Sequence, residues 1–253
     1  MSGFQEIFQR TEIKYLLSEE QYLALRDRLQ GMAEVDQYGE TDILNIYYDT
    51  PDFSLIRASL EKPLYKEKLR LRSYGTPGEQ STSFIEIKKK YKGVVYKRRI
   101  DAPYMDAKEY LEGKKDLEQR SQIKSEIDAF RTGYEGLKPA MAISYKRIAM
   151  AGTEDPELRI TFDREIRWRI EGLDLREGAV GEDLLKKGQR LMEVKIANAF
   201  PLELARMFSE LGIFPVSYSK YGSGYQTMAL RQMATYQAVG RTASATEHAV
   251  AYA

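Results

Sequence analysis

Charged side chains recur at every second position along several segments of this sequence. Residues 65–74 carry a row of four cations, Lys66, Lys68, Arg70 and Arg72. Residues 83–91 carry Glu86, Lys88 and Lys90, which alternate there with isoleucines. Successive side chains of a β-strand point to opposite faces, so each row lies on one face of a predicted strand. Arginine binds phosphate oxygens through its planar fork and lysine supplies a point charge, so such rows favour recognition of a phosphorylated polyanion.

The same pattern in other segments yields a larger candidate set. The cations expected on the charged faces are Lys14, Lys68, Arg70, Arg72, Lys88, Lys90, Arg99, Arg147, Arg159 and Lys195. The acids among them are Glu12, Glu86 and Glu193. A few carboxylates in a basic wall could partly neutralise it and hold a divalent ion that bridges phosphate oxygens. Phosphoryl transfer recurrently uses that arrangement.

The elements that must position these rows allow two arrangements. In one, sheets are stacked with helices on their apolar faces, and the charged faces lie in water, as charged faces usually do. In the other, the sheet closes into a barrel whose charged faces line the interior, and about eight strands would leave room for a narrow ligand. A buried excess of cations is costly unless it is paired, so the barrel would need a polyanionic ligand.

The periodicity predicts an α+β protein with the following elements. Strands are expected at residues 8–17, 42–49, 65–74, 83–91, 94–101, 141–149, 157–168 and 191–196. Helices are expected from the Ser18 cap to Met32, from residue 50, within 106–136, and at 201–211 and 225–233. We expect a single domain over residues 1–236 and a disordered tail over 237–253.

Residues 217–224 are expected to form a loop before the last helix. Ser219, Lys220, Gly222 and Gly224 in this loop have the composition of a small anion-binding nest at a helix start. Serine and glycine of this kind also occur in plain turns, so the two interpretations stay open on the residues alone.

Composition narrows the chemistry further. The 253 residues have a formal net charge of +1, which argues against a general nucleic-acid binder. There is no cysteine and a single histidine, so disulfides and thiolate or histidine metal sites are not expected. A metal would be held by carboxylates and substrate oxygens, which favours Mg²⁺, Mn²⁺ or Ca²⁺. We expect a cytoplasmic protein without a transmembrane segment or signal peptide.

The ordered set of segments resembles the VTC-type polyphosphate polymerase domain, a branch of the CYTH-like triphosphate tunnel metalloenzymes. The matching stretches are Thr11-Glu-Ile-Lys-Tyr15, Ile46-Tyr-Tyr-Asp-Thr-Pro-Asp-Phe53, Lys66-Glu-Lys-Leu-Arg-Leu-Arg-Ser-Tyr-Gly75, Phe84-Ile-Glu-Ile-Lys88, Tyr145-Lys-Arg147, Leu158-Arg-Ile-Thr-Phe-Asp163, Leu191-Met-Glu-Val-Lys195 and Tyr218-Ser-Lys-Tyr221. The resemblance implies an eight-stranded antiparallel β-barrel tunnel with a charged interior, covered by peripheral helices.

The resemblance also implies roles for individual residues. Phosphates would be held by Lys14, Arg70, Arg72, Lys88, Arg147, Arg159 and Lys220, with Ser219 at the product end. Glu193 would hold the metal, Mn²⁺ or Mg²⁺, with Glu86 as a helper. The implied reaction transfers the γ-phosphate of ATP to a polyphosphate chain and releases ADP.

The first strand departs from the CYTH pattern. CYTH members carry Glu-x-Glu-x-Lys there, whereas this sequence has Arg10, Glu12 and Lys14. Loss of the first acid favours the VTC branch and leaves the metal resting mainly on Glu193. Two alternatives to polymerisation stay open, namely a metal-dependent triphosphatase or tripolyphosphatase and a non-catalytic polyphosphate-binding module.

Overall fold

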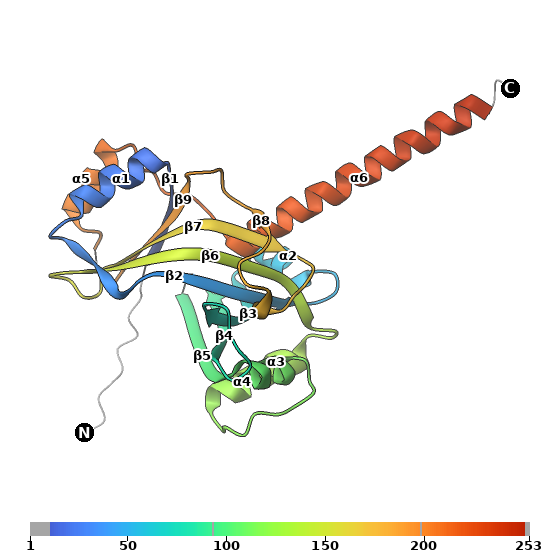
Figure 1. Ribbon diagram of the computed structural model, residues 1–253, viewed down its shortest axis with the longest axis horizontal. Coiled ribbons are helices and arrows are strands. Elements are labelled where there is room, and N and C mark those ends of the chain that lie inside the picture. The colour runs from blue at the N-terminus through green and yellow to red at the C-terminus, as the bar shows by residue number, and fades with distance from the viewer. Residues whose placement is uncertain (1–10, 93, 198, 251–253) are drawn as a thin grey trace.

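The computed structural model describes residues 11–92, 94–197 and 199–250, with side chains described as far as residue 235. The strands are β1 (Thr11–Leu17), β2 (Ala33–Asp49), β3 (Tyr65–Tyr74), β4 (Thr82–Tyr91), β5 (Val94–Pro103), β6 (Lys138–Gly152), β7 (Arg159–Arg169), β8 (Glu182–Asp183) and β9 (Arg190–Ile196). The helices are α1 (Glu19–Arg28), α2 (Ser54–Leu60), α3 (Tyr104–Leu111), α4 (Gln122–Gly133), α5 (Leu202–Glu210) and α6 (Lys220–Val250), with a 3₁₀ turn at Leu175–Glu177. Figure 1 shows α6 projecting from the body that the sheet forms.

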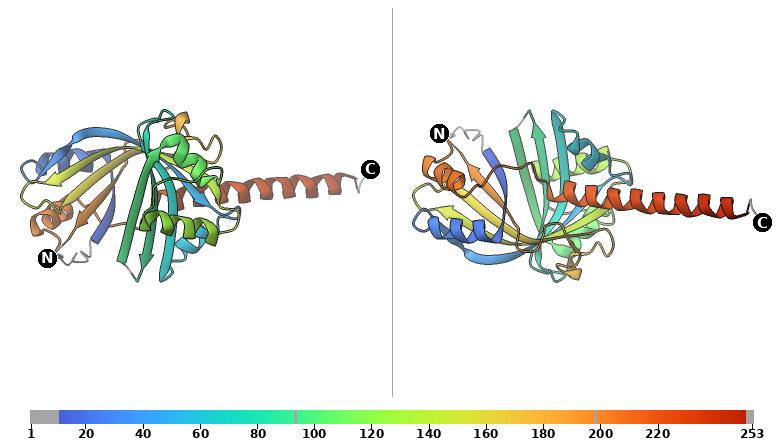
Figure 2. Two further views of the ribbon diagram at one scale, coloured as in Figure 1. Left: turned by 90° about the horizontal axis from the view of Figure 1, so that it is seen from below. Right: turned by 90° about the horizontal axis from the view of Figure 1, so that it is seen from above.

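All the strands belong to one antiparallel sheet. Its main path runs β1-β9-β7-β6-β2-β3-β4-β5, and β8 pairs with β7. This confirms the predicted α+β class and the eight-stranded antiparallel arrangement under peripheral helices. The sheet is curled so far that both views of Figure 2 place β1 beside β5.

The expected closure of the barrel is only approached, because the ladder order of the described residues ends at β1 and at β5. Part of the free edge of β1 is taken by the chain that leads from α5 to α6. The Val216 N–H donates to the Lys14 carbonyl at 2.7 Å, and Tyr15 forms an isolated bridge with Pro215. Proline has no N–H to donate, so the pairing with β1 stays short.

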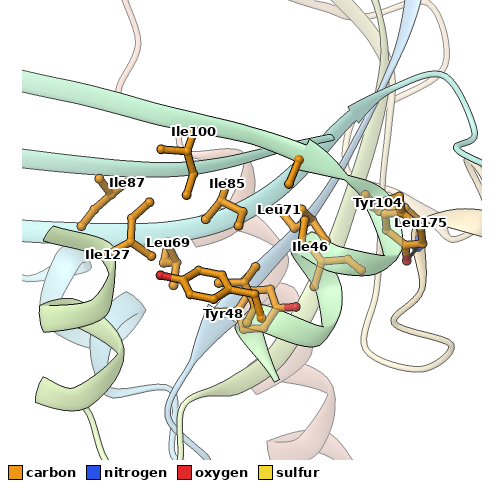
Figure 3. Packing of buried hydrophobic residues seen from close by; sticks show 14 of the residues in the cluster. Ile46, Tyr48, Leu69, Leu71, Ile85, Ile87, Ile100, Tyr104, Ile127 and Leu175 are labelled. Carbon is orange, nitrogen blue, oxygen red and sulfur yellow. Dashed lines mark hydrogen bonds between the residues drawn. The ribbon is translucent and has the colours of Figure 1, made fainter. Parts of the chain in front are cut away.

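Two apolar cores lie on the outer face of the sheet. One packs β2–β5 against α3 and α4, and Figure 3 shows Leu69, Ile85, Ile87 and Ile100 of these strands close to Ile127 of α4. The other packs β1, β7 and β9 against α1 and α5. The apolar face therefore points outward under helices and the charged face points inward, which selects the barrel-like arrangement over the stacked sheets.

A third apolar cluster covers one end of the inner face. It joins inward-facing residues of β2 and β6 to α2 and the first turns of α6, including Tyr47, Ile143, Ile56, Tyr221 and Met228. The Tyr221 ring stacks on the Tyr47 ring with 4.5 Å between centroids. The charged lining therefore adjoins an apolar floor at this end.

Several predicted boundaries differ from the structure. The strand expected at residues 42–49 begins at Ala33, and Gly39, at a φ of 59°, lies at an irregularity in its pairing with β6. The helix expected to reach Met32 ends at Arg28, although the predicted capping box of Ser18 with Gln21 is present. The expected first strand included residues 8–10, and the expected hairpin turn included Gly93; these residues lie outside the described ones.

The last helix begins inside the expected loop and runs to Val250, where a tail without structure was expected from residue 237. A Cβ on Gly222 would lie 3.0 Å from Leu60, and one on Gly224 would lie 2.6 Å from the Met141 sulfur. These glycines therefore serve close packing of α6 on its neighbours rather than a turn. The alanines beyond residue 233 are strong helix formers.

Candidate active site

The strand registers place the predicted charge rows on one face. Arg70 pairs with Glu86, which pairs in turn with Arg99. At the other end of the sheet, Lys14 pairs with Glu193. Residues directly opposite in an antiparallel ladder share a face. The inner face thus carries all the rows that the two-residue period predicts.

One centre of this face is formed around Glu193 of β9, whose side chain is nearly buried. Its Oε1 lies 3.3 Å from Lys14 Nζ and 3.0 Å from Lys220 Nζ, and its Oε2 lies 3.3 Å from the Arg147 guanidinium. Burial by itself would raise the pKa of Glu193, but the charges of Lys220, Lys14 and Arg147 hold it well below its usual value. Glu193 is therefore an anion enclosed by three cations from β1, β6 and α6.

Asp163 of β7 is fully buried and completes this centre. It receives two bonds from the Arg147 guanidinium, at 2.6 and 2.7 Å, and lies 2.6 Å from Lys220 Nζ. Burial opposes its charge, yet Arg147 and Lys220 keep the pKa of Asp163 lowered. The carboxylate fixes both cations in place, because a bidentate arginine fork has little freedom to reorient.

A second centre is formed around Glu86 of β4. Its Oε2 lies 2.8 Å from Arg70 Nε and 3.6 Å from Arg72 Nε, and its Oε1 lies 2.8 Å from Lys97 Nζ. Burial would raise the pKa of Glu86, but Arg70, Arg72 and Lys97 lower it strongly. Glu86 is thus the counterion of three cations, and its predicted role as a helper in metal binding stays a prediction.

Two tyrosines connect the centres to the apolar floor. The Tyr47 hydroxyl accepts a bond from Arg70 at 3.0 Å, and the Tyr145 hydroxyl accepts one from Arg72 at 3.1 Å. Arg72 also donates to the Asn45 side-chain oxygen at 2.9 Å. These neutral acceptors orient the guanidinium groups and add no negative charge to that of Glu86.

The remaining predicted residues lie at different depths. Lys68 donates to the Ser219 hydroxyl at 3.3 Å, and Lys88 is half-buried beside the charges of Glu12 and Lys14. Lys195 lies 3.8 Å from Glu12. Arg159, Lys90 and Arg99 are exposed at the rim, where Arg99 rests on the Phe84 ring.

Sequence reasoning missed Asp163, Lys97, Tyr47 and Tyr145 as parts of the site. Asp163 lies on the same strand face as Arg159 and Thr161, and Lys97 lies on the same face as Arg99. The two-residue period therefore placed both residues on the charged face. Tyr145 shares a strand face with Arg147, but neither tyrosine was predicted as a site residue, because an aromatic residue in a strand normally indicates a core position.

The donor set suits a hard divalent cation. Among the described residues no three acids or histidines lie close enough to form a metal cage. Glu193 and Glu12 lie on neighbouring strands and carry the carboxylate oxygens that Mg²⁺ and Mn²⁺ prefer. Mg²⁺ is commonly bound by one or two carboxylates together with substrate phosphates, and these two acids fit that mode.

The strand period itself can be tested on one strand. Lys88 faces the inner wall, whereas Lys89 faces α4, where its Nζ lies 3.8 Å from Glu126. If the inner face binds polyphosphate as the resemblance predicts, Lys88→Ala should weaken that binding about tenfold or more, because it removes a half-buried cation from the wall. Lys89→Ala should leave binding nearly unchanged. Equal losses in a calorimetric titration of the two variants would contradict the inward assignment.

Binding of polyphosphate, the ligand that the sequence resemblance predicts for the inner face, should depend on pH near neutrality. Burial lowers the pKa of Lys68 to about 8, with repulsion from Lys66 and Lys88 adding to it. Burial likewise lowers the pKa of Lys97 to about 8, against the attraction of Glu86. Both amines lose charge as the pH rises from 7 to 9, so the affinity for polyphosphate should fall over that interval.

The measurement is a titration of polyphosphate at several pH values in buffers of different ionisation enthalpy. Because a bound polyanion favours the charged lysines, binding near pH 8 should take up protons. Arginine stays charged throughout. The double variant Lys68→Arg/Lys97→Arg should therefore bind with a flatter pH dependence, and an unchanged slope would show that other groups cause it.

The candidate site is therefore the cation-rich inner wall of a curled antiparallel sheet that is covered by helices on its outer face. The chain belongs to the VTC domain family, whose model matches residues 9–229. No curated protein matches the sequence. In the described part of the chain, no helix has the length and apolar character needed to cross a membrane.

Solved structures agree with this fold. One is a Bacillus halodurans protein described as a candidate adenylate cyclase, with 15% identity, a TM-score of 0.52, and coverage of 83% of this chain and 95% of that one. Another is a Hippeastrum protein described as a candidate adenylyl cyclase with dominant triphosphatase activity, with 17% identity, a TM-score of 0.52, and coverage of 85% and 95%. At these identities the likeness is one of fold.

Proposed function

We propose that this protein is a metal-dependent phosphotransferase that moves the γ-phosphate of ATP to a polyphosphate chain. The observation that carries the proposal is the convergence of cations from β1, β3, β4, β5, β6 and α6 on one concave face, where they outnumber the acids. Membership of the VTC domain family supports it. An excess of buried cations is costly unless it is paired, so such a wall favours a polyanionic ligand.

The residues suggest how transfer would proceed. The forks of Arg70, Arg72 and Arg147 and the ammonium groups of Lys14 and Lys220 would hold non-bridging phosphate oxygens and align the attacking and leaving oxygens. Glu193, with Glu12 beside it, would hold a divalent ion, which supplies Lewis-acid neutralisation of phosphate charge. Because the transferring phosphoryl group has a loose transition state, positioning and charge stabilisation provide most of the catalysis.

Hydrolysis is the second candidate function. The fold of the Hippeastrum protein described with triphosphatase activity is similar. The same cations would hold a triphosphate equally well, and a water molecule could take the place of the chain end as acceptor.

Product analysis separates the candidates. The protein is incubated with ATP and Mn²⁺ or Mg²⁺, and the products are resolved by gel electrophoresis and nucleotide chromatography. Polyphosphate chains together with ADP support the proposal. Free phosphate without chain growth would show a hydrolase, and unchanged ATP with tight polyphosphate binding would show a binding module.

Arg70→Ala should reduce turnover by at least about tenfold, because it removes a charged donor to the transferring group. The same variant leaves Glu86 with Arg72 and Lys97 as partners, so the carboxylate is not left unpaired. Arg206→Ala, at an exposed position of α5, is the matched control. Similar turnover in the two variants would remove Arg70 from the site.

A further inference from the structure

Asp49, the last residue of β2, has a fully buried carboxylate that lies outside the two charged centres. Its Oδ1 accepts from the Thr50 N–H at 2.8 Å and from the Leu55 N–H at 2.9 Å. Its Oδ2 accepts from the Ile56 N–H at 3.0 Å and from the Tyr221 hydroxyl at 2.7 Å. Leu55 and Ile56 belong to the first turn of α2, and Tyr221 belongs to the first turn of α6. The carboxylate therefore joins α2 to α6.

The bond from Tyr221 to Asp49 is well defined on the tyrosine side. Tyr221 is buried, and its burial together with the nearby charge of Asp49 raises the pKa of the hydroxyl. The hydroxyl therefore keeps its proton and donates it to a charged acceptor, which is a strong type of hydrogen bond. The stacking of the Tyr221 ring on Tyr47 fixes the plane of the ring as well.

Tyr221 directly follows Lys220, which reaches into the centre around Glu193. Lys220 Nζ lies 2.6 Å from Asp163 and 3.0 Å from Glu193. Consecutive residues of an α-helix point about 100° apart around its axis. The first turn of α6 is therefore held on two sides, by the ion pairs of Lys220 on one and by Asp49 on the other.

The two attachments restrain α6 in different ways. A lysine ammonium is a point charge on a flexible stem, so its ion pairs allow the helix to turn while contact is kept. The hydroxyl bond and the ring stacking of Tyr221 are directional and oppose such a turn. This restraint matters because α6 projects from the body beyond its first turns, as Figure 1 shows.

We propose that Asp49 and Tyr221 are positioning residues, which set the place of the Lys220 ammonium at Glu193 and Asp163 through the first turn of α6. This rests on the proposed function, in which Lys220 holds phosphate oxygens. A displacement of about 1 Å caused by a residue remote from the reacting atoms can lower a rate about a hundredfold. The bond should therefore affect turnover more than its contribution to folding would explain.

The first test compares Tyr221→Phe with Tyr110→Phe. Tyr110 is also fully buried, and its hydroxyl donates to Asp128 at 2.6 Å in the outer core beside α4. Each variant keeps its ring and loses one bond to a carboxylate, so the two melting temperatures should fall by similar amounts. Tyr221→Phe should lower ATP turnover about tenfold, whereas Tyr110→Phe should keep the wild-type rate.

The second test is a double-mutant cycle with Lys220→Met. In that background Asp163 keeps Arg147, and Glu193 keeps Lys14 and Arg147. If Tyr221 acts through Lys220, adding Tyr221→Phe to Lys220→Met should change the remaining turnover by less than about twofold. Residues that act independently would instead multiply their effects.

The outcomes separate this inference from the proposed function. Equal turnover in Tyr221→Phe and Tyr110→Phe, or a further tenfold loss in the Lys220→Met background, would overturn the positioning role while ATP is still turned over by the wild type. A wild-type protein without any turnover would contradict the proposed function instead. Amide hydrogen exchange then decides the positioning, because Tyr221→Phe should speed exchange in the first turns of α6 and Tyr110→Phe should not. Unchanged exchange in Tyr221→Phe would overturn the inference.

Discussion

Glu193→Gln is expected to lower ATP turnover by at least about tenfold while metal-free polyphosphate binding is kept or tightened. The carboxylate is the one enclosed by Lys14, Lys220 and Arg147, and we propose that it holds the divalent ion. The amide keeps the shape but removes the negative charge, so the wall becomes more attractive to polyphosphate and less able to bind the metal. The measurements are initial rates at several Mn²⁺ concentrations and calorimetric titration without metal.

Glu203→Gln, at an exposed position of α5, is the control for a general effect of losing one carboxylate. Its rates and affinities should match those of the wild type. A Glu193→Gln protein with normal turnover would exclude Glu193 as the metal-holding group. A loss of both turnover and metal-free binding would instead indicate that the carboxylate organises the cations.

Asp163→Ala should reduce the free energy of unfolding by about 3–5 kcal/mol, the usual effect of removing one partner of a buried ion pair. Its carboxylate is fully buried and binds both Arg147 and Lys220, which would be left close together without it. Glu193 still contacts both cations, but it also neutralises Lys14. Urea denaturation at neutral pH measures the change.

Asp183→Ala removes an acid of the same type that is 61% exposed and contacts Arg167, and should change the unfolding free energy by less than about 1 kcal/mol.

Asp163 should also stabilise the protein in a pH-dependent way. Its pKa is lowered in the folded state, so its contribution is present above the unfolded value near 3.8 and is lost as the pH falls through the folded value. Wild-type stability of Asp163→Ser or Asp163→Asn would show that Arg147 and Lys220 need no buried anion here.

The sequence predicted that the charges of each strand share one face, because strand alternation is a local property. Lys66 to Arg72 on one face of β3 follows from the two-residue period alone, and the structure confirms that face as the inner one. The helix cap could be predicted for the same reason, because the capping box of Ser18 involves only residues close in the sequence. The choice between stacked sheets and a curled sheet could not be made locally, since it depends on which elements cover the apolar faces.

The grouping of the acids was not predictable for the same reason. Glu86 and Glu193 lie on strands that are far apart in the sheet order, so their assignment to separate centres depends on the curl of the sheet. Asp163 lies in a segment where polar residues alternate with apolar ones such as Ile160. Its burial becomes evident only in the structure, where α6 places Lys220 against it. Gly222 and Gly224 indicated a turn in the sequence, whereas they lie in the first turns of α6, where tertiary packing requires them to be small.

The layering of this fold keeps two of its three apolar clusters apart from the charged face. The apolar cores lie between the outer face of the sheet and α1, α3, α4 and α5, while much of the inner face carries charge. Exchanges among the inner cations can therefore alter ligand preference with little change in core packing. A lineage built on this plan can diversify its chemistry through the inner positions of its strands while the outer positions stay constant.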